Sequence, residues 1–279
     1  MGSMKQIAMI VLLTFSLAVK SEPLDYKAWE DSLLTIRTNS LETESDSLKL
    51  LFNKKLKETW LTVLSDEHSI DYPFDSIKSI GFLKSDDQSM RIINWELQLT
   101  DNSILYFAII QFKTKKKNSY RLLELNDQSS SIKKPEKVVL EANNWYGAHY
   151  YKLVESHYKK KKYYTLLGAN FSDPLIKKKV VEILNIQSDG KIKFGQSVFL
   201  SEKSDNKRII FQYSPEISMS LRYEESIESI IFDHLVPRAA GLVGQFGFYG
   251  PDFSFDAFRW KKGKWTLEED IDARNKRNR

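Results

Sequence analysis

The feature that most restricts the fold of this chain is a two-residue alternation of apolar side chains that starts near Met90. Residues 90–99 and 104–112 alternate in this way on either side of Asp101 and Asn102, a dipeptide that favours a tight turn. Successive side chains of a strand point to opposite faces, so the pattern is typical of strands with one buried face. It predicts a mainly β protein, an antiparallel meander that is propeller-like or built of curved sheets.

Shorter alternating runs follow along the rest of the chain. They predict strands at 120–125, 150–155, 163–169, 179–186, 192–199, 208–213, 218–223, 229–235, 253–260 and 265–268. The segments 188–191 and 261–264 each place a glycine between two such runs. Because glycine tolerates the positive φ that tight hairpins require, both segments are expected to be hairpin turns.

The region 22–70 has a different period. Apolar residues recur there at spacings of three and four, which predicts an amphipathic helix; they are Leu48, Leu51, Phe52, Leu56, Trp60, Val63 and Leu64. A looser apolar pattern from Leu24 to Ile36 predicts an earlier helix, with Asn39 and Ser40 separating the two. We therefore expect an N-terminal helical hairpin whose apolar side covers a sheet.

The β part of the chain is interrupted once by a change in composition. Residues 127–137 are polar and serine-rich with one proline, which is typical of a linker or a long loop. The expected organisation is therefore a first β region at 71–127 and a second at 138–279.

The first 21 residues predict export. Lys5 precedes a short apolar run, and Val19 and Ser21 stand at the −3 and −1 positions of a cut before Glu22. A basic start, an apolar run too short to span a bilayer and a small-residue exit are typical of a secretory signal peptide, here residues 1–21. The chain has no cysteine, so a lipoprotein anchor, disulfides and thiolate metal sites are excluded.

Charge and location together limit the partners. The formal charge is +5, and removal of Lys5 and Lys20 with the signal peptide leaves +3. Such a mild charge on an exported chain argues against nucleic acid as a partner, and no second segment is apolar enough to span a membrane. The expected location is the periplasm, the outer envelope or the extracellular space, and no cofactor is expected.

Several short segments give the chain a family likeness. They are YPFDSIK (72–78), RIINW (91–95), YYTLLG (163–168), FGQSVF (194–199), IFDHL (231–235) and FYGPDFSFD (248–256). Together they resemble an uncharacterised family of secreted proteins from Bacteroidota-type bacteria, and the likeness spans most of the mature chain. The resemblance implies a Gram-negative envelope context. It supplies no activity and no catalytic residues.

The most unusual segment holds the acidic candidates. On an unbroken strand after Pro251, Asp252 and Asp256 would share one face with Ser254. Two carboxylates and a hydroxyl could bind Ca²⁺ or serve as acid and base, with His234 as a further candidate. The alternative is a solvated face over an aromatic core. The neighbouring Asp233 and His234 are not expected to touch, because adjacent strand residues point to opposite faces.

Aromatic and basic clusters provide further candidates. Trp145, Tyr146, Tyr249 and Trp260 could form sugar-stacking platforms, although core or cross-strand packing is the simpler expectation. The lysine clusters at 113–117, 159–162 and 177–179 could contact an acidic glycan or lipopolysaccharide, or could be solvated hairpin tips that protect sheet edges.

No P-loop, dinucleotide fingerprint, nucleophile elbow or metal-binding histidine motif occurs in the sequence. We therefore expect a non-catalytic envelope module that binds a protein or a glycan. The alternatives are a carboxylate-based glycan hydrolase at Asp252 and Asp256 and a Ca²⁺-stabilised binding module at the same two residues.

Overall fold

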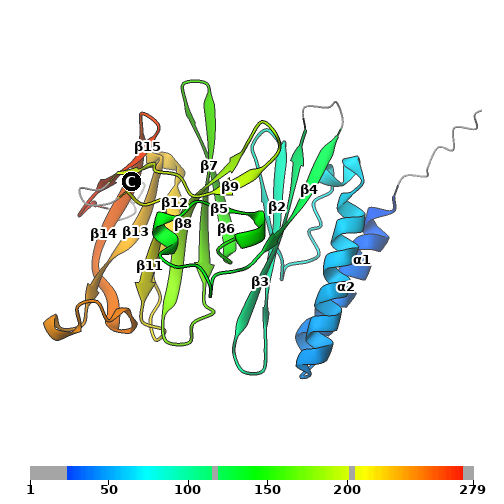
Figure 1. The fold of residues 1–279 in the computed structure, drawn as a ribbon, viewed down its shortest axis with the longest axis horizontal. Helices are drawn as coiled ribbons and strands as arrows, with labels where there is room; N and C mark the ends of the chain where they lie inside the picture. The colour runs from blue at the N-terminus through cyan, green and yellow to red at the C-terminus, as the bar shows by residue number, and fades with distance from the viewer. Residues whose placement is uncertain (1–23, 115–118, 201–204, 273–279) are drawn as a thin grey trace, which may run out of the picture.

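The computed structural model describes residues 24–114, 119–200 and 205–272, so the expected signal peptide lies outside the described residues. The described residues form two α-helices followed by three sheets, which confirms the predicted mainly β fold with an N-terminal helical hairpin (Figure 1). The helices are α1 (Tyr26–Glu42) and α2 (Asp46–Leu64). The strands are β1 (Gly81–Lys84), β2 (Met90–Gln98), β3 (Ile104–Lys113), β4 (Tyr120–Asn126), β5 (Leu140–Glu141), β6 (His149–Tyr158), β7 (Lys161–Asn170), β8 (Lys177–Ile186), β9 (Ile192–Phe194), β10 (Phe199–Leu200), β11 (Arg208–Tyr213), β12 (Leu221–Glu224), β13 (Ser229–Pro237), β14 (Tyr249–Lys261) and β15 (Lys264–Glu268).

The helical hairpin turns later than the sequence predicts. The expected break at Asn39 and Ser40 lies inside α1, where Ser40 is fully buried against α2 and donates a hydrogen bond to the Lys49 carbonyl. The chain turns at 43–45 instead, because the Ser45 hydroxyl accepts a hydrogen bond from the amide of Leu48 and so caps the start of α2.

The first sheet has the strand order β1-β2-β3-β4 and is antiparallel throughout. The second has the order β5-β9-β8-β7-β6, and β11 also pairs with β8. The third has the order β10-β15-β14-β13-β12, in which only the short β10 runs parallel to its neighbour. The predicted strand 192–199 is divided between two sheets, because Gly195, at φ +91°, turns the chain after β9.

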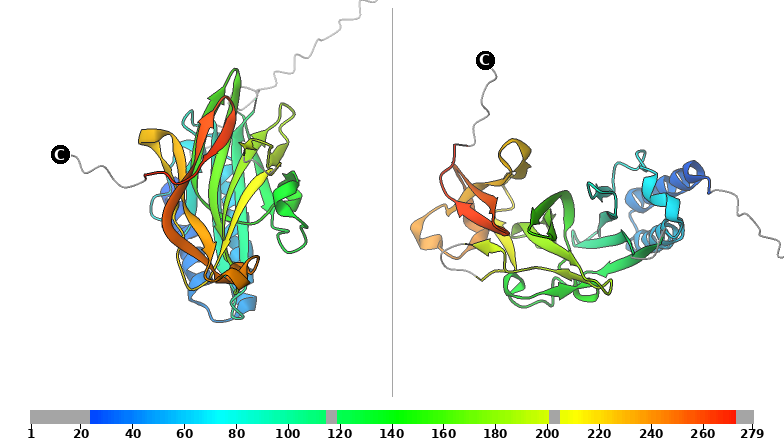
Figure 2. Two further views of the ribbon diagram at one scale, coloured as in Figure 1. Left: turned by 90° about the vertical axis from the view of Figure 1, so that its left-hand side faces the viewer. Right: turned by 90° about the horizontal axis from the view of Figure 1, so that it is seen from above.

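The sheets stack face to face in chain order, and each gap between them holds an apolar core. The helices and the outer face of the first sheet enclose Trp60 and Ile93. The other face of the first sheet packs on the second through Ile92 and Tyr150. The second packs on the third through Val181 and Phe258. Figure 2 shows that the stack follows an open arc.

The segment 127–137 does not separate two independent cores. Residues from both predicted β regions share the core between the first and second sheets. A buried cation also holds this segment against the second sheet, because the Arg208 guanidinium donates to the carbonyls of Pro135 and Val138 and pairs with Glu182. The linker is therefore part of the packed fold.

Candidate functional site

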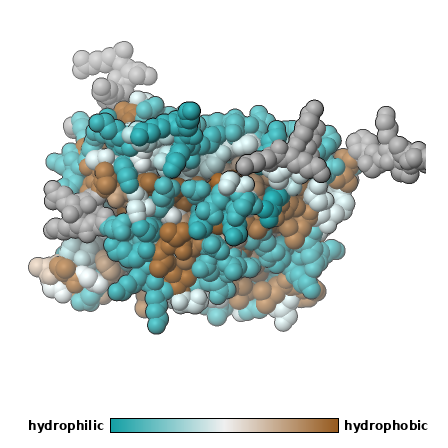
Figure 3. Space-filling model, turned by 45° about the horizontal axis from the view of Figure 1, so that its top comes forward, coloured by the Kyte–Doolittle hydropathy of each residue, from teal (hydrophilic) through white to brown (hydrophobic). Residues whose placement is uncertain are grey.

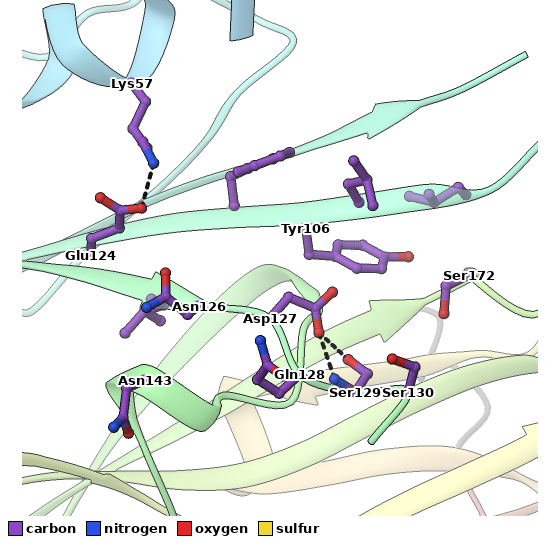
Figure 4. A pocket seen from close by; sticks show the side chains of 14 residues that line it. Lys57, Tyr106, Glu124, Asn126, Asp127, Gln128, Ser129, Ser130, Asn143 and Ser172 are labelled. Carbon is purple, nitrogen blue, oxygen red and sulfur yellow. Dashed lines mark hydrogen bonds and ion pairs between the residues drawn. The ribbon is translucent and has the colours of Figure 1, made fainter. Parts of the chain in front are cut away.

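A polar hollow of about 480 Å³ lies beside the first sheet, where β3 begins and β4 ends (Figure 4). The chain leaving β4 forms one wall with residues 126–130, and Asn143 and Ser172 approach from the segments before β6 and after β7. With Lys57 from α2, five segments distant in sequence meet at one concave place. Concavity with convergent polar groups is the usual character of a small-ligand site.

The wall of the hollow is fixed by Asp127. Its carboxylate accepts hydrogen bonds from the amides of Ser129 and Gly147, at 2.9 and 3.1 Å, and from the Ser129 hydroxyl. A Cβ on Gly147 would lie 2.3 Å from this carboxylate, so only glycine fits at that position. Two backbone hydrogen bonds with Trp145 hold the flanking residues Asn126 and Gln128. The wall is therefore rigidly placed, although it contains no regular strand.

The hollow carries polar groups that the protein itself does not use. The side chains of Asn126, Gln128, Ser130 and Asn143 make no hydrogen bond to any other described residue, and Figure 4 shows them around the cavity. An amide side chain both donates and accepts hydrogen bonds, and a hydroxyl does the same. These groups therefore match a ligand that is rich in neutral donors and acceptors.

Two of the three charged side chains at the hollow neutralise each other. Lys57 on α2 and Glu124 on β4 form an ion pair at 2.6 Å, with both side chains about one-third exposed. The third, the Asp127 carboxylate, is occupied by its hydrogen bonds, as described above. The lining therefore keeps one formal negative charge, on a carboxylate that is bound within its own wall.

Two aromatic residues form an apolar part of the lining. The Phe107 ring stacks on Trp95 with centroids 5.6 Å apart. Tyr106 is buried, and its hydroxyl accepts a hydrogen bond of 2.6 Å from the amide of Phe171; burial raises the pKa of this hydroxyl, which stays neutral. Because Tyr106 is only 3% exposed, the ring surface beside the amide groups comes from the half-buried Phe107. Such a surface suits the C–H face of a polar molecule.

The segment that carries the acidic candidates is not the unbroken strand that the sequence predicts. The ladder between β13 and β14 breaks at His234, and Phe253 has φ +71°, so an irregularity replaces the unbroken strand. The Asp252 carboxylate accepts two hydrogen bonds from Ser254, from the amide at 3.0 Å and from the hydroxyl at 2.7 Å. Asp256 lies 2.7 Å from Nδ1 of His234 and also accepts a hydrogen bond from the amide of Asp270. The two carboxylates thus have separate partners.

The pairing with Asp256 alters the chemistry of His234. The hydrogen bond that the imidazole donates to the Asp256 carboxylate raises the pKa of His234 above its ordinary value. The hydrogen bonds from Ser254 lower the pKa of Asp252. Among the described residues, no three His, Asp or Glu side chains are grouped so that they could hold a metal ion. The geometry at this irregularity is that of a half-exposed histidine oriented by a buried carboxylate.

The aromatic candidates are mainly packing residues. Trp145 and Tyr146 are 0% and 4% exposed in the core between the first and second sheets, so neither ring is available as a stacking platform. Trp260 pairs with Trp265 across the predicted hairpin, with centroids 5.1 Å apart. Tyr249 is half-buried, and its hydroxyl accepts a hydrogen bond from the amide of Gly244.

Sequence reasoning did not find the hollow. Most of the wall at 126–130 falls in the segment that the sequence presents as a linker, and the hollow is completed by residues from four more segments. The one available signal was the Asp127-Gln128-Ser129 triplet, because an aspartate followed two residues later by serine favours a side-chain turn. That signal predicts a turn and not a binding site.

Comparison of the chain with models of protein families, with curated proteins and with solved structures gives no match. The class of protein is therefore defined by the fold and the site: a stack of mainly antiparallel sheets, covered at one end by a helical hairpin, with a polar hollow. Neither of the described α-helices is long and apolar enough to cross a membrane.

Proposed function

We propose that this protein is an exported, non-catalytic binding module whose hollow holds an uncharged polar ligand, and that the ligand is a glycan of the cell envelope. The observation that carries the proposal is the set of amide and hydroxyl side chains at the hollow that lack partners among the described residues. Sugar hydroxyls can satisfy such groups in both directions, as donors and as acceptors.

The charges at the hollow support binding rather than hydrolysis. A glycan hydrolase needs two carboxyl groups that face the bond to be cleaved, one of them free to act as an acid. At the hollow, Glu124 is paired with Lys57, and Asp127 accepts hydrogen bonds from its own loop. The carboxylates present there thus maintain the shape of the site.

Export is supported by the sequence alone, through the basic start, apolar run and cleavage pattern of residues 1–21. We expect the protein recovered from cells to begin at Glu22. N-terminal sequencing of the product checks this directly, and an uncleaved chain in the cytoplasmic fraction would contradict the proposed location.

The ligand is tested by calorimetric titration of the protein with neutral cello-, malto-, xylo- and manno-oligosaccharides and with N-acetylglucosamine oligomers. We expect at least one of them to bind, and the double variant Gln128→Ala/Asn143→Ala to weaken binding about tenfold, because each lost hydrogen bond is worth about 0.5–1.5 kcal/mol. Asn185→Ala is the matched control, an exposed amide on β8 outside the hollow. If no oligosaccharide binds, or if the control weakens binding equally, the proposal is wrong.

His234 supports a second candidate function, hydrolysis. Its Nδ1 is held by the buried Asp256, which orients the imidazole and leaves the other ring nitrogen available as a general base. Cleavage of chromogenic glycosides that is lost in His234→Ala and retained in Asn143→Ala would favour this function. Absence of turnover by the unmodified protein would remove it.

A further inference from the structure

An uncharged loop projects from the third sheet between β13 and β14. Residues 239–251, with the sequence AAGLVGQFGFYGP, carry no charge and lie between Arg238 and Asp252. Val243 is 70% exposed and Phe248 is 45% exposed, and Phe246 is also exposed. A Cβ added to Gly241 or Gly244 would meet nothing within 4 Å, so this part of the loop stands clear of the rest of the protein.

The loop has an ordered shape of its own. Its backbone turns are closed by the hydrogen bonds of Leu242 to Ala239, of Gln245 to Leu242 and of Phe248 to Gln245, at 2.9, 3.0 and 3.0 Å. Gly244 takes φ +85° and donates its amide to the Tyr249 hydroxyl. Because these amides are satisfied internally, the loop can enter a less polar medium at a smaller desolvation cost.

A second exposed apolar residue lies beside this loop. Leu175, in the turn between β7 and β8, is 73% exposed, and its carbonyl oxygen is 3.0 Å from the position of a Cβ on Gly247. Leu175, Val243, Phe246 and Phe248 together are called the apolar tip. In Figure 3 the loop forms the tan and brown projection at the lower left.

Charged side chains of both signs surround the apolar tip. Arg238 pairs with Glu216, and Lys178 lies 3.9 Å from Asp173. Asp252 follows the loop, and its carboxylate accepts hydrogen bonds from Ser254. Lys177 makes no ion pair with a described acid, and its ammonium group lies 5.9 Å from the centre of the Phe171 ring, so it is available to a lipid phosphate.

We propose that the apolar tip inserts into the interface of a bilayer that contains anionic lipids. A convex group of Phe, Val and Leu side chains bordered by lysine is what interfacial binding requires, because the rings enter the headgroup region while the cations meet lipid phosphates. The inference does not depend on the ligand of the hollow. It does place that hollow near the membrane surface, because Ser172 of the hollow and Leu175 of the apolar tip share one turn.

The test is sedimentation of the protein with lipid vesicles. It uses the chain from Glu22 onward, which keeps every residue that the structure describes and removes the apolar leader. We expect binding to vesicles of phosphatidylethanolamine with phosphatidylglycerol and much weaker binding to phosphatidylcholine alone. Val243→Asp/Phe248→Ser should reduce partitioning about tenfold or more, since two apolar side chains no longer enter the bilayer.

The matched control is Leu51→Asp, which places the same charge at an exposed leucine of α2. It should bind as the unmodified chain does, and melting curves should show that both variants fold. As a second readout, Phe248→Trp should shift its fluorescence to shorter wavelength with anionic vesicles, whereas Leu51→Trp should not.

Three results would overturn the proposal. The unmodified chain could remain in the supernatant with anionic vesicles, or Leu51→Asp could lower binding as much as the tip variant does. The third is a dimer in solution that becomes a monomer in Val243→Asp/Phe248→Ser, which would make the apolar tip an interface between copies of the chain.

Discussion

The hollow and the apolar tip are opposite kinds of surface on one scaffold. The hollow is concave and carries polar side chains that lack partners among the described residues, whereas the tip is convex and carries apolar side chains that lack cover. The hollow is assembled from segments far apart in the chain, and the tip comes mostly from one uninterrupted loop. Because the two surfaces use different residues, we expect substitutions to alter one without the other.

The largest expected effect concerns the buried ion pair behind the hollow. Arg208 and Glu182 are both fully buried with Nε and Oε2 2.9 Å apart, and Arg208 also holds the Val138 carbonyl. Arg208→Met should therefore cost about 3–5 kcal/mol of unfolding free energy, since it leaves a buried carboxylate without its partner. Urea denaturation measures this loss.

The control for Arg208→Met is Lys261→Met, which breaks the exposed pair of Lys261 with Glu268 and should cost about 1 kcal/mol or less. Folded Arg208→Met should bind vesicles normally while its glycan binding weakens. Equal losses in the two variants would mean that the buried pair does not hold the segment beside the hollow.

Substitution of one glycine at the hollow and one on the loop compares the packing of the two regions. Gly147→Ala should cost about 1–3 kcal/mol and weaken glycan binding, because its Cβ would displace the Asp127 carboxylate from its hydrogen bonds. Gly241→Ala, in open space on the loop, should change stability by about 0.5 kcal/mol or less. Thermal and urea unfolding of both variants check this, and similar costs at the two positions would contradict the described wall of the hollow.

Binding at the apolar tip and binding at the hollow should depend differently on salt concentration. Contact between Lys177 beside the apolar tip and lipid phosphates is screened by salt, so vesicle binding should fall as ionic strength rises. Glycan binding should change little, because the proposed ligand is uncharged and Lys57 and Glu124 are already paired with each other. Titrations at low and high salt test this, and a glycan affinity that falls with salt would point to a charged ligand.

The smallest expected effect is a pH dependence from His234, which lies outside both surfaces. Its pKa is raised in the folded protein by the hydrogen bond that the imidazole donates to Asp256. Its contribution to stability is therefore complete below the unfolded pKa of about 6.5 and is lost as pH rises through the folded value. His234→Gln should remove this pH dependence without altering either kind of binding. An NMR titration that gives a pKa at or below the ordinary value would contradict it.

Local sequence patterns predicted the strands well, because the alternation that marks a strand depends only on residues close together in the chain. The turns at Asn102, Gly190 and Gly263 have the positive φ that their sequences favour. β1 gave a weaker signal, because it has four residues and little alternation. The stacking of the sheets explains why Ile92 and Ile93 are both buried, since β2 has a core on each face.

The sites could be predicted less well, because they depend on three-dimensional packing. The prediction for Asp252 and Asp256 assumed an unbroken strand, whereas the ladder is irregular opposite His234, and no local pattern predicts that irregularity. Trp145 is enclosed by the meeting of two sheets, and no local pattern shows that. The hollow likewise exists only after β3, β4 and the turn at Ser172 have come together.

Hydrogen–deuterium exchange with and without the best-binding oligosaccharide tests the central claim most directly. The account predicts that the ligand slows exchange at 104–107 and 124–130, the segments that line the hollow. Protection confined to 252–256, or no protection at the hollow under saturating ligand, would contradict it.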